Sequence, residues 1–333
     1  MIYITGDTHG DFRHFSNRRM RVDLPGLTEK DYIIICGDFG MCWGHEYSRT
    51  FEFNKEFFSA KPYTILWVQG NHENYDMLEE FELEEWNGGK VRHIVRDKVI
   101  LLERGQVFNI EGNTVFTFGG ASSHDISGGV LDRKDPNFAL KKKRASRDGL
   151  PFRILRESWW PQELPTEEEM QEGLRNLEKV DYKVDYVITH CCATSVQDLL
   201  DSTPGSLYDA DILTDYFQTL EEKLTYRHWY FGHYHDDKPV DEKHTLLYHF
   251  ITKLGDADVD YDHIPKLGHP KYGFHEEVVF LCGNEEITGR IDIIDAFGTF
   301  DQNDEPSYDI YREENNTLYK HIPESFIVSR KGE

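Results

Sequence analysis

The chain has 333 residues, of which 38% are hydrophobic and 14% aromatic, which is enough for a sizeable core and excludes a disordered chain. Its 37 Lys and Arg against 61 Asp and Glu give a formal net charge of -24, which repels phosphate backbones and argues against long duplex nucleic acid as a partner. No apolar run is long enough to span a bilayer, no secretion signal is visible, and the five cysteines form no CxxC pair. We therefore expect a soluble cytoplasmic protein with reduced thiols and no membrane partner.

Short apolar runs rich in β-branched and aromatic residues predict a series of buried strands. Each run ends at Gly, Asp, Asn or His, and the runs are Ile2–Thr5, Tyr32–Cys36, Thr64–Val68, Val115–Phe118, Tyr186–Thr189 and Trp229–Phe231. Strands that are apolar along their whole length are buried on both faces, which indicates a sheet covered by helices. Helix-compatible segments at Arg49–Ser59 and Asn74–Glu82 follow the early strands, and this alternation is typical of βαβ units in an α/β protein.

The segment 91–118 has a different pattern. Close-spaced runs at Val91–Val95, Val99–Leu102, Val107–Ile110 and Thr114–Phe118 are separated by turn signals, so we expect an antiparallel meander in a second sheet. Residues 120–165, rich in Gly, Ser, Arg and Trp, are interpreted as an insertion. A helix is predicted from Pro165 to about Lys179, because Thr166 and Glu169 form a capping box at its start.

A domain boundary is expected after residue 255. Residues 256–272 are rich in Gly, Asp, His and Pro and are interpreted as a linker that follows a main domain of residues 1–255. Residues 273–333 contain short alternating runs at Glu277–Leu281, Ile287–Ile294 and Ser307–Tyr311, which predict a small β-rich domain. No chemistry-bearing cluster is visible there, so the sequence assigns this domain no role.

Residues that can bind metal ions follow five of the predicted strands. They are Asp7 and His9, Asp38, the run Asn71-His72-Glu73, His190, and the pair His233 and His235. Ligands of open α/β sheets bind in the crevice outside the carboxyl ends of the strands. One such residue after a strand is usually only a turn or cap residue. Because five strands in succession carry them, we expect these side chains to meet at one edge.

The donor types at this edge predict the chemistry. Carboxylate, imidazole and amide groups together suit divalent transition-metal ions such as Mn, Fe, Zn, Co or Ni. Two such ions about 3.5–4 Å apart can clamp an in-line displacement at phosphorus and lower the pKa of a water between them. Asp38 is the natural bridge, because a carboxylate has two oxygens.

The complete pattern DxH…GD…GNHE…H…GHxH, over residues 1 to about 250, resembles the calcineurin-like metallophosphoesterase superfamily. The resemblance implies a four-layer αββα sandwich of mixed sheets. It implies that one metal ion is held by Asp7, His9, Asp38 and His235, and the other by Asp38, Asn71, His190 and His233. It also implies that His72 is not a ligand but protonates the leaving oxygen, and that Glu73 orients His72.

One difference from the superfamily's sequence pattern narrows the range of activities that we expect. Its protein phosphatases and dinucleotide tetraphosphatases extend the second motif to GDxxDRG, in which the Arg grips the substrate phosphate. Here Met41 and Cys42 stand in place of that Asp and Arg. This difference argues against those two activities, and the chain is more similar to the bacterial and phage-type phosphoesterases.

Substrate contacts are then expected from the insertion. Arg133, Arg153 and His124 are the candidates, and Trp159 with Trp160 would either cover the substrate or pack the insertion against the domain. Of the histidines outside the motifs, His45 is the strongest further candidate because it follows Asp38 closely.

The sequence therefore predicts a two-metal phosphoesterase acting on a small phosphate ester. We expect a phosphodiesterase or phosphatase with a nucleotide-sized substrate. Two alternatives remain: a nuclease acting on single strands or ends through the basic run Lys141–Arg144, and a catalytically silent metal-binding interaction module. The presence of His72 and of all seven ligand positions disfavours the second.

Overall fold

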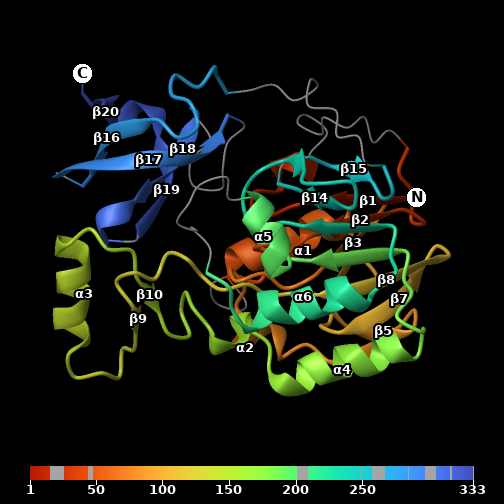
Figure 1. Ribbon diagram of the computed structural model, residues 1–333. Helices are drawn as coiled ribbons and strands as arrows, with labels where there is room; N and C mark the ends of the chain where they lie inside the picture. Colours follow the sequence, from red (N-terminus) through yellow and green to blue (C-terminus); the bar gives the residue numbers. More distant parts are fainter. Residues whose placement is uncertain are drawn as a thin grey trace. The chain divides into compact units, whose positions relative to one another are not determined.

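The computed structural model describes residues 1–15, 26–43, 48–200, 209–248, 250–256, 267–283, 285–296, 305–315 and 317–332 (Figure 1). The chain forms two compact units. The first comprises Met1–Ser122 and Trp160–Asp260, and the second comprises Ser123–Trp159 and Tyr261–Glu333. Within the described ranges, no helix combines the length and the apolar character needed to cross a membrane.

The first unit contains a seven-stranded sheet. Its spatial order is β15 (Thr252–Lys253), β1 (Ile2–Thr5), β2 (Tyr32–Ile35), β3 (Thr64–Trp67), β6 (Val99–Leu102), β5 (Gly89–Val95) and β4 (Leu83–Trp86). Strands β1, β2, β3 and β6 are parallel, and β15, β5 and β4 are antiparallel to their neighbours. The carboxyl ends of β1, β2 and β3 therefore lie along one edge.

A second sheet of six strands belongs to the same unit. Its order is β13 (Lys238–Pro239), β14 (His244–Leu246), β12 (His228–Phe231), β11 (Tyr186–Thr189), β8 (Asn113–Phe118) and β7 (Gln106–Ile110). Strands β8, β11, β12 and β14 are parallel, whereas β7 and β13 are antiparallel to their neighbours. This sheet also presents the carboxyl ends of successive strands along one edge.

Each sheet packs against its own helices. Among the described residues, the α-helices of this unit are α1 (Arg49–Ser59), α2 (Tyr75–Leu78), α4 (Glu167–Glu178), α5 (Thr194–Leu200) and α6 (Ile212–Lys223) (Figure 1). Two short 3₁₀ helices, η1 (Phe12–Phe15) and η2 (Pro161–Glu163), accompany them. Ile33 and Ile35 of β2 share a core cluster with Phe58 of α1, and Trp229 of β12 shares another with Phe217 of α6. Ile34, on the opposite face of β2, is equally buried. The α/β class is confirmed, and the four-layer order of the sandwich stays a prediction.

The predicted meander over residues 91–118 is wrong in its placement, because the chain changes sheets in the middle of it. β5 and β6 belong to the first sheet, and only β7 and β8 belong to the second. All four residues of β6 are buried, and Ile65 pairs with Val99, so β6 is an interior parallel strand. Apolar spacing is the same in both sheets and carries no information about which neighbour a strand will pair with.

The helices agree with the sequence in two of three places. Arg49–Ser59 is helical as predicted, and the Thr166–Glu169 capping box begins α4. The helix expected over Asn74–Glu82 ends after one turn, at Leu78, because the chain continues into β4. A polar surface segment can form either structure, and here the pairing of β4 with β5 decides.

The second unit is built on a five-stranded antiparallel sheet. Its order is β19 (Thr317–Pro323), β18 (Ser307–Arg312), β17 (Glu285–Asp295), β16 (Glu277–Cys282) and β20 (Ile327–Arg330), with η4 (Glu313–Asn315) and η5 (Glu324–Phe326). The same unit holds β9 (Val130–Leu131), β10 (Arg153–Ile154) and α3 (Phe138–Arg147). Most of the predicted insertion thus groups with the C-terminal strands. The predicted boundaries stay a prediction, and residues 257–266 of the predicted linker lie outside the described residues.

Candidate metal centre

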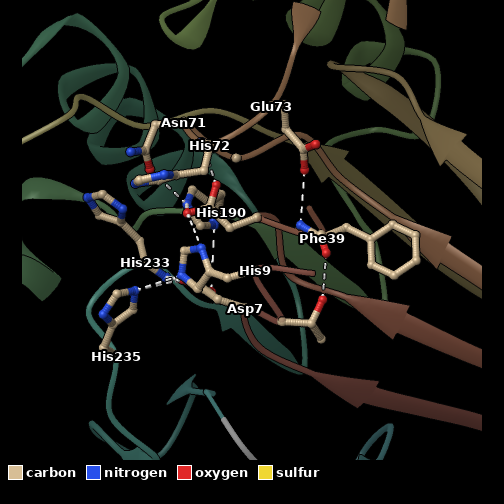
Figure 2. A network of polar contacts seen from close by, with 12 residues as sticks. Asp7, His9, Phe39, Asn71, His72, Glu73, His190, His233 and His235 are labelled. Carbon is tan, nitrogen blue, oxygen red and sulfur yellow. Dashed lines mark hydrogen bonds and ion pairs between the residues drawn. The ribbon is translucent and has the colours of Figure 1, made fainter. Parts of the chain in front are cut away.

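The strand ends of both sheets deliver the predicted metal-binding residues to one place (Figure 2). Asp7 and His9 follow β1, Asp38 follows β2, Asn71 and His72 follow β3, His190 follows β11, and His233 and His235 follow β12. Parallel pairing aligns the ends of β1, β2 and β3, and separately those of β11 and β12. The polar residues therefore gather because parallel strands end together.

Asp7, His9 and His235 form the first group of potential ligands. The Nε2 atoms of the two histidines face each other at 3.0 Å. Asp7 Oδ2 lies 3.7 Å from His9 Nε2 and 3.4 Å from His235 Nε2. Two imidazole nitrogens and a carboxylate oxygen thus point at a common position.

Asp38 joins this group to a second one. Its Oδ2 lies 3.8 Å from His9 Nδ1 and 3.4 Å from His190 Nε2. His190 Nε2 also lies 3.1 Å from Asn71 Oδ1, and the His190 and His233 rings are 5.0 Å apart. The Asp38 carboxylate stands between the two groups, where a bridging ligand would have to lie.

The backbone holds both carboxylates in place. The His72 backbone N–H donates to Asp38 Oδ1 at 2.7 Å, and the His233 backbone N–H donates to Asp7 Oδ1 at 3.0 Å. The His9 backbone N–H donates to the Asp38 carbonyl at 2.8 Å. Each loop therefore positions a residue carried by another loop, so the arrangement is pre-organised.

Four of these residues have a backbone conformation that L-residues avoid. The φ angles of His9, Asp38, His233 and His235 are 46°, 47°, 72° and 52°. A non-glycine residue in a sparsely populated backbone region costs on the order of 1–3 kcal/mol and persists only where the surrounding structure imposes it. Concentration of such residues in one cluster is typical of a functional site.

Two glycines make room for the carboxylates. A Cβ atom on Gly70 would lie 1.9 Å from Asp38 Oδ1, and one on Gly232 would lie 2.1 Å from Asp7 Oδ1. No Cβ can approach a carboxylate oxygen so closely, so any side chain at these positions would displace the acid. Each of these positions must therefore be glycine, because a side chain there would displace a carboxylate that follows a different strand.

The buried charges interact strongly. Burial alone would raise the pKa of Asp38, but His190 and His72 outweigh it and hold that pKa well below its usual range. Burial alone would lower the pKa of His190, but Asp38 and Asp7 raise it to about 9. His190 Nδ1 lies 2.7 Å from the Cys36 carbonyl, which can only accept, so Nδ1 carries a hydrogen and Nε2 is directed at the cluster.

This donor set fits divalent transition-metal ions. Imidazole nitrogens and carboxylate oxygens form overlapping groups, and within each group the atoms lie within 4.8 Å of one another. The Asn71 amide oxygen adds a further donor at 3.1 Å from His190 Nε2. Without a cation, two buried carboxylates and facing imidazole nitrogens would be a costly arrangement. The assignment of individual residues as ligands stays a prediction.

Comparison with known proteins agrees with this geometry. The family model of calcineurin-like phosphoesterases matches residues 1–237. The chain belongs to this family. The family uses a dinuclear divalent metal centre, so the protein is a metal-dependent phosphoesterase, a hydrolase.

No curated protein matches the chain. Among solved structures, the crystal structure of a phosphopantetheinyl hydrolase from Mycobacterium tuberculosis aligns with 74% of this chain and 88% of its own, with 13% identity and a TM-score of 0.34.

Glu73 of the phosphoesterase contacts the loop that follows Asp38. It is fully buried, and its Oε1 accepts a hydrogen bond from the Phe39 backbone N–H at 3.0 Å (Figure 2). The Phe39 carbonyl in turn accepts from Thr8 Oγ1 at 2.7 Å. This gives Glu73 a role beyond the expected one of orienting His72, because it joins the second and third motifs.

The predicted substrate contacts of the phosphoesterase all lie in the second unit, where each has an acidic or basic neighbour. Arg133 donates to Glu157, with Nη2 2.7 Å from Oε2, and Arg153 Nε donates to Asp125 Oδ1 at 3.0 Å. Burial and Lys320 lower the pKa of His124 to about 3. Their role in substrate binding stays a prediction, and His45 lies outside the described residues.

Sequence reasoning missed residues that support the cluster. The Tyr248 ring stacks on the His235 ring at 4.6 Å with an angle of 13° between them. Asp237 Oδ1 accepts from the Tyr248 backbone N–H at 2.7 Å and thereby holds this segment. Tyr75 donates its hydroxyl to the Gly70 carbonyl at 2.7 Å. Tyr75 and Asp237 follow motifs closely and could have been suspected, whereas Tyr248 carries no local signal.

Proposed function

We propose that the phosphoesterase hydrolyses a small, nucleotide-sized phosphate ester, as a phosphodiesterase or a phosphatase, at the cluster around Asp38. The single observation that carries the proposal is the position of this carboxylate, which belongs to two of the overlapping donor groups and lies 3.8 Å from His9 Nδ1 and 3.4 Å from His190 Nε2. A binding module would need no such shared carboxylate, whereas a two-ion hydrolytic site does.

The ligands divide between two ions in this proposal. Asp7, His9, Asp38 and His235 hold one ion, and Asp38, Asn71, His190 and His233 hold the other. When bound, the two ions supply an activated water and the positive charge that offsets charge developing on the phosphoryl oxygens. The chain's own contribution is to keep the donors pre-organised through the backbone hydrogen bonds to Asp7 and Asp38.

His72 acts as the general acid. His72 is half-buried and its ring lies edge-on to the His9 ring at 5.2 Å, so it borders the cluster and keeps part of its surface exposed. Its backbone N–H is committed to Asp38, which fixes the position of the residue relative to the carboxylate. In that position its imidazole holds a proton for the leaving oxygen, as general acids do. Glu73 positions the loop after Asp38 through the Phe39 N–H.

The experiment uses metal-stripped protein re-loaded with Mn, Ni, Zn or Mg. Hydrolysis of bis-(p-nitrophenyl) phosphate and of p-nitrophenyl phosphate is measured, and the preferred ester separates diesterase from monoesterase. Asp38→Ala is expected to lose bound metal and turnover together, because it removes a donor that belongs to two of the overlapping groups. Full activity in that variant contradicts the proposal. No turnover with any metal, although two ions are bound per chain, would instead favour the interaction module.

The nuclease alternative gains no support from the basic run. Within this run, Lys141 pairs with Asp135 at 2.7 Å and Arg144 pairs with Asp148 at 3.7 Å, all in the second unit. Cations that already face carboxylates are poorly suited to bind a phosphate backbone. The nuclease reading therefore stays a prediction from sequence alone.

A further inference from the structure

We propose that Trp43 forms a stacking platform for a flat aromatic group on the leaving-group side of the substrate. This inference rests on the proposed function and deepens it by naming the class of alcohol that is released, a nucleoside or an aryl-bearing alcohol. Trp43 was not among the candidate residues of the sequence analysis, and it belongs to the first unit together with the metal centre.

The backbone that carries Trp43 is held by the motif loops. The Gly10 backbone N–H donates to the Phe39 carbonyl at 3.0 Å, and the Asn74 backbone N–H donates to the Cys42 carbonyl at 3.1 Å. Met41 and Cys42 are buried, with 2% and 1% of their surfaces exposed, whereas Trp43 is 37% exposed. The segment thus anchors itself with two buried side chains and then presents an indole to solvent.

The indole lies directly beside the proposed general acid. The centroids of the Trp43 and His72 rings are 5.6 Å apart, with 39° between the ring planes. Because His72 is proposed to protonate the leaving oxygen, a ring in contact with His72 lies beside the leaving group. A stacking group at this place would act on the alcohol part of the ester, not on the phosphoryl part.

A second tryptophan, Trp160, packs against Trp43. Trp160 is 1% exposed and packs edge-on against Trp43 at 5.8 Å. Its indole Nε1 donates to Asp76 Oδ2 at 2.9 Å, which fixes its orientation. A rigid ring on one side restricts the motion of Trp43 and leaves its remaining surface available. Such a pre-organised aromatic surface loses little entropy when a ligand stacks on it.

The chemistry of this surface differs from that of the extended GDxxDRG motif. Where that motif carries a phosphate-gripping Arg, this chain carries the buried Cys42, followed by Trp43. The surface that Trp43 contributes next to His72 is therefore aromatic, without the positive charge of an Arg. Aromatic faces recognise flat π-systems such as nucleobases and aryl rings, and stacking is worth about 1–3 kcal/mol per base.

The test compares substrates that differ only in the flat group. Adenosine 5′-monophosphate and ribose 5-phosphate release the same kind of primary alcohol with and without a base. Benzyl phosphate and cyclohexylmethyl phosphate have similar size, and only the first is flat. The methyl diesters of the same four alcohols replace them if the enzyme prefers diesters. The measured quantity is the ratio of kcat/KM within each pair, for wild type, Trp43→Ala and Trp43→Phe.

We expect the wild type to favour the flat member by about 5- to 150-fold, which corresponds to the stacking energy. Trp43→Ala should bring this ratio close to one, and Trp43→Phe should keep most of it. Phe53→Ala is the matched control, because Phe53 is an aromatic residue with 66% exposure on α1 and should leave both ratios unchanged. If Trp43→Ala changes the ratio of the nucleotide pair alone, the platform selects a nucleobase. If it changes the ratios of both pairs, the platform accepts any aryl group.

A ratio near one in the wild type, or an unchanged ratio in Trp43→Ala, would overturn the proposal. An equal fall for both members of a pair would also overturn it, since this would mean that Trp43 only supports His72. If the metal-loaded protein hydrolyses neither compound, calorimetric titration with adenosine 5′-monophosphate and ribose 5-phosphate gives the corresponding ratio of dissociation constants. If no ester is hydrolysed, the proposed function fails, while the binding ratio still tests the platform.

Discussion

At the scale of single residues, His72 is the side chain whose removal should separate chemistry from metal binding. His72→Ala removes the imidazole but keeps the backbone N–H that donates to Asp38 at 2.7 Å. We expect the variant to bind two ions per chain and to lose about 10²- to 10⁴-fold in turnover of esters with poor leaving groups. Activated p-nitrophenyl esters need little protonation and should lose much less. Metal analysis and turnover of both ester types would check this, and equal losses on both would contradict the assignment.

A second residue-scale prediction concerns pH. In the metal-free protein, Asp38 and Asp7 raise the pKa of His190 to about 9, above the ordinary value of histidine. Protonated His190, next to the carboxylates of Asp38 and Asp7, therefore stabilises the folded metal-free protein fully at pH values below the ordinary pKa of histidine. This stabilisation is lost as the pH rises through about 9. An ion bound at His190 must displace that proton.

Metal affinity should consequently increase as the pH rises towards 9, by about tenfold per pH unit for one displaced proton. Asp38, whose pKa lies well below its usual range, stays ionised over this window and does not reverse the sign. Competition with a chelator of known affinity, measured at several pH values, would check the slope. An affinity for the metal that does not depend on pH would contradict a protonated His190.

At the scale of elements, the loop after β12 determines the position of a carboxylate that follows β1. A Cβ on Gly232 would lie 2.1 Å from Asp7 Oδ1, so Gly232→Ala should displace the carboxylate that follows β1. We expect metal affinity to fall by at least about tenfold, as for other residues that orient ligands. Gly268→Ala is the matched control, since its Cβ would meet only Pro306, at an ordinary 3.5 Å. Unchanged metal affinity in Gly232→Ala would show that the loop can relax.

At the scale of the whole molecule, the formal net charge of -24 should slow the arrival of an anionic ester. Like charges repel over roughly 10 Å at an ionic strength near 0.1 M and over longer distances in more dilute salt. We therefore expect kcat/KM for a phosphate ester to rise as sodium chloride is added from low ionic strength, with kcat little changed. Steady-state kinetics at fixed metal concentration would check this. A fall in kcat/KM would mean that the bound ions dominate the local field.

The strands and the site motifs were predictable because their signals are local. Runs such as Tyr186–Thr189 are nearly continuously apolar, which already indicates burial on both faces. Asp7 and His9 stand just past such a run, and the carboxyl ends of parallel strands meet at one edge. The sequence alone therefore predicted that the metal-binding side chains gather at one edge, and it also predicted the family.

Only the tertiary structure decided which elements become neighbours. β6 joins the first sheet and β7 the second, although both are short apolar runs, because pairing depends on partners far along the chain. For the same reason the contact of Glu73 with the Phe39 N–H, the stacking of Tyr248 on His235, and the place of Trp43 beside His72 have no counterpart in local sequence. Sequence determined which chemical groups stand at the strand ends, whereas long-range packing determined what surrounds them.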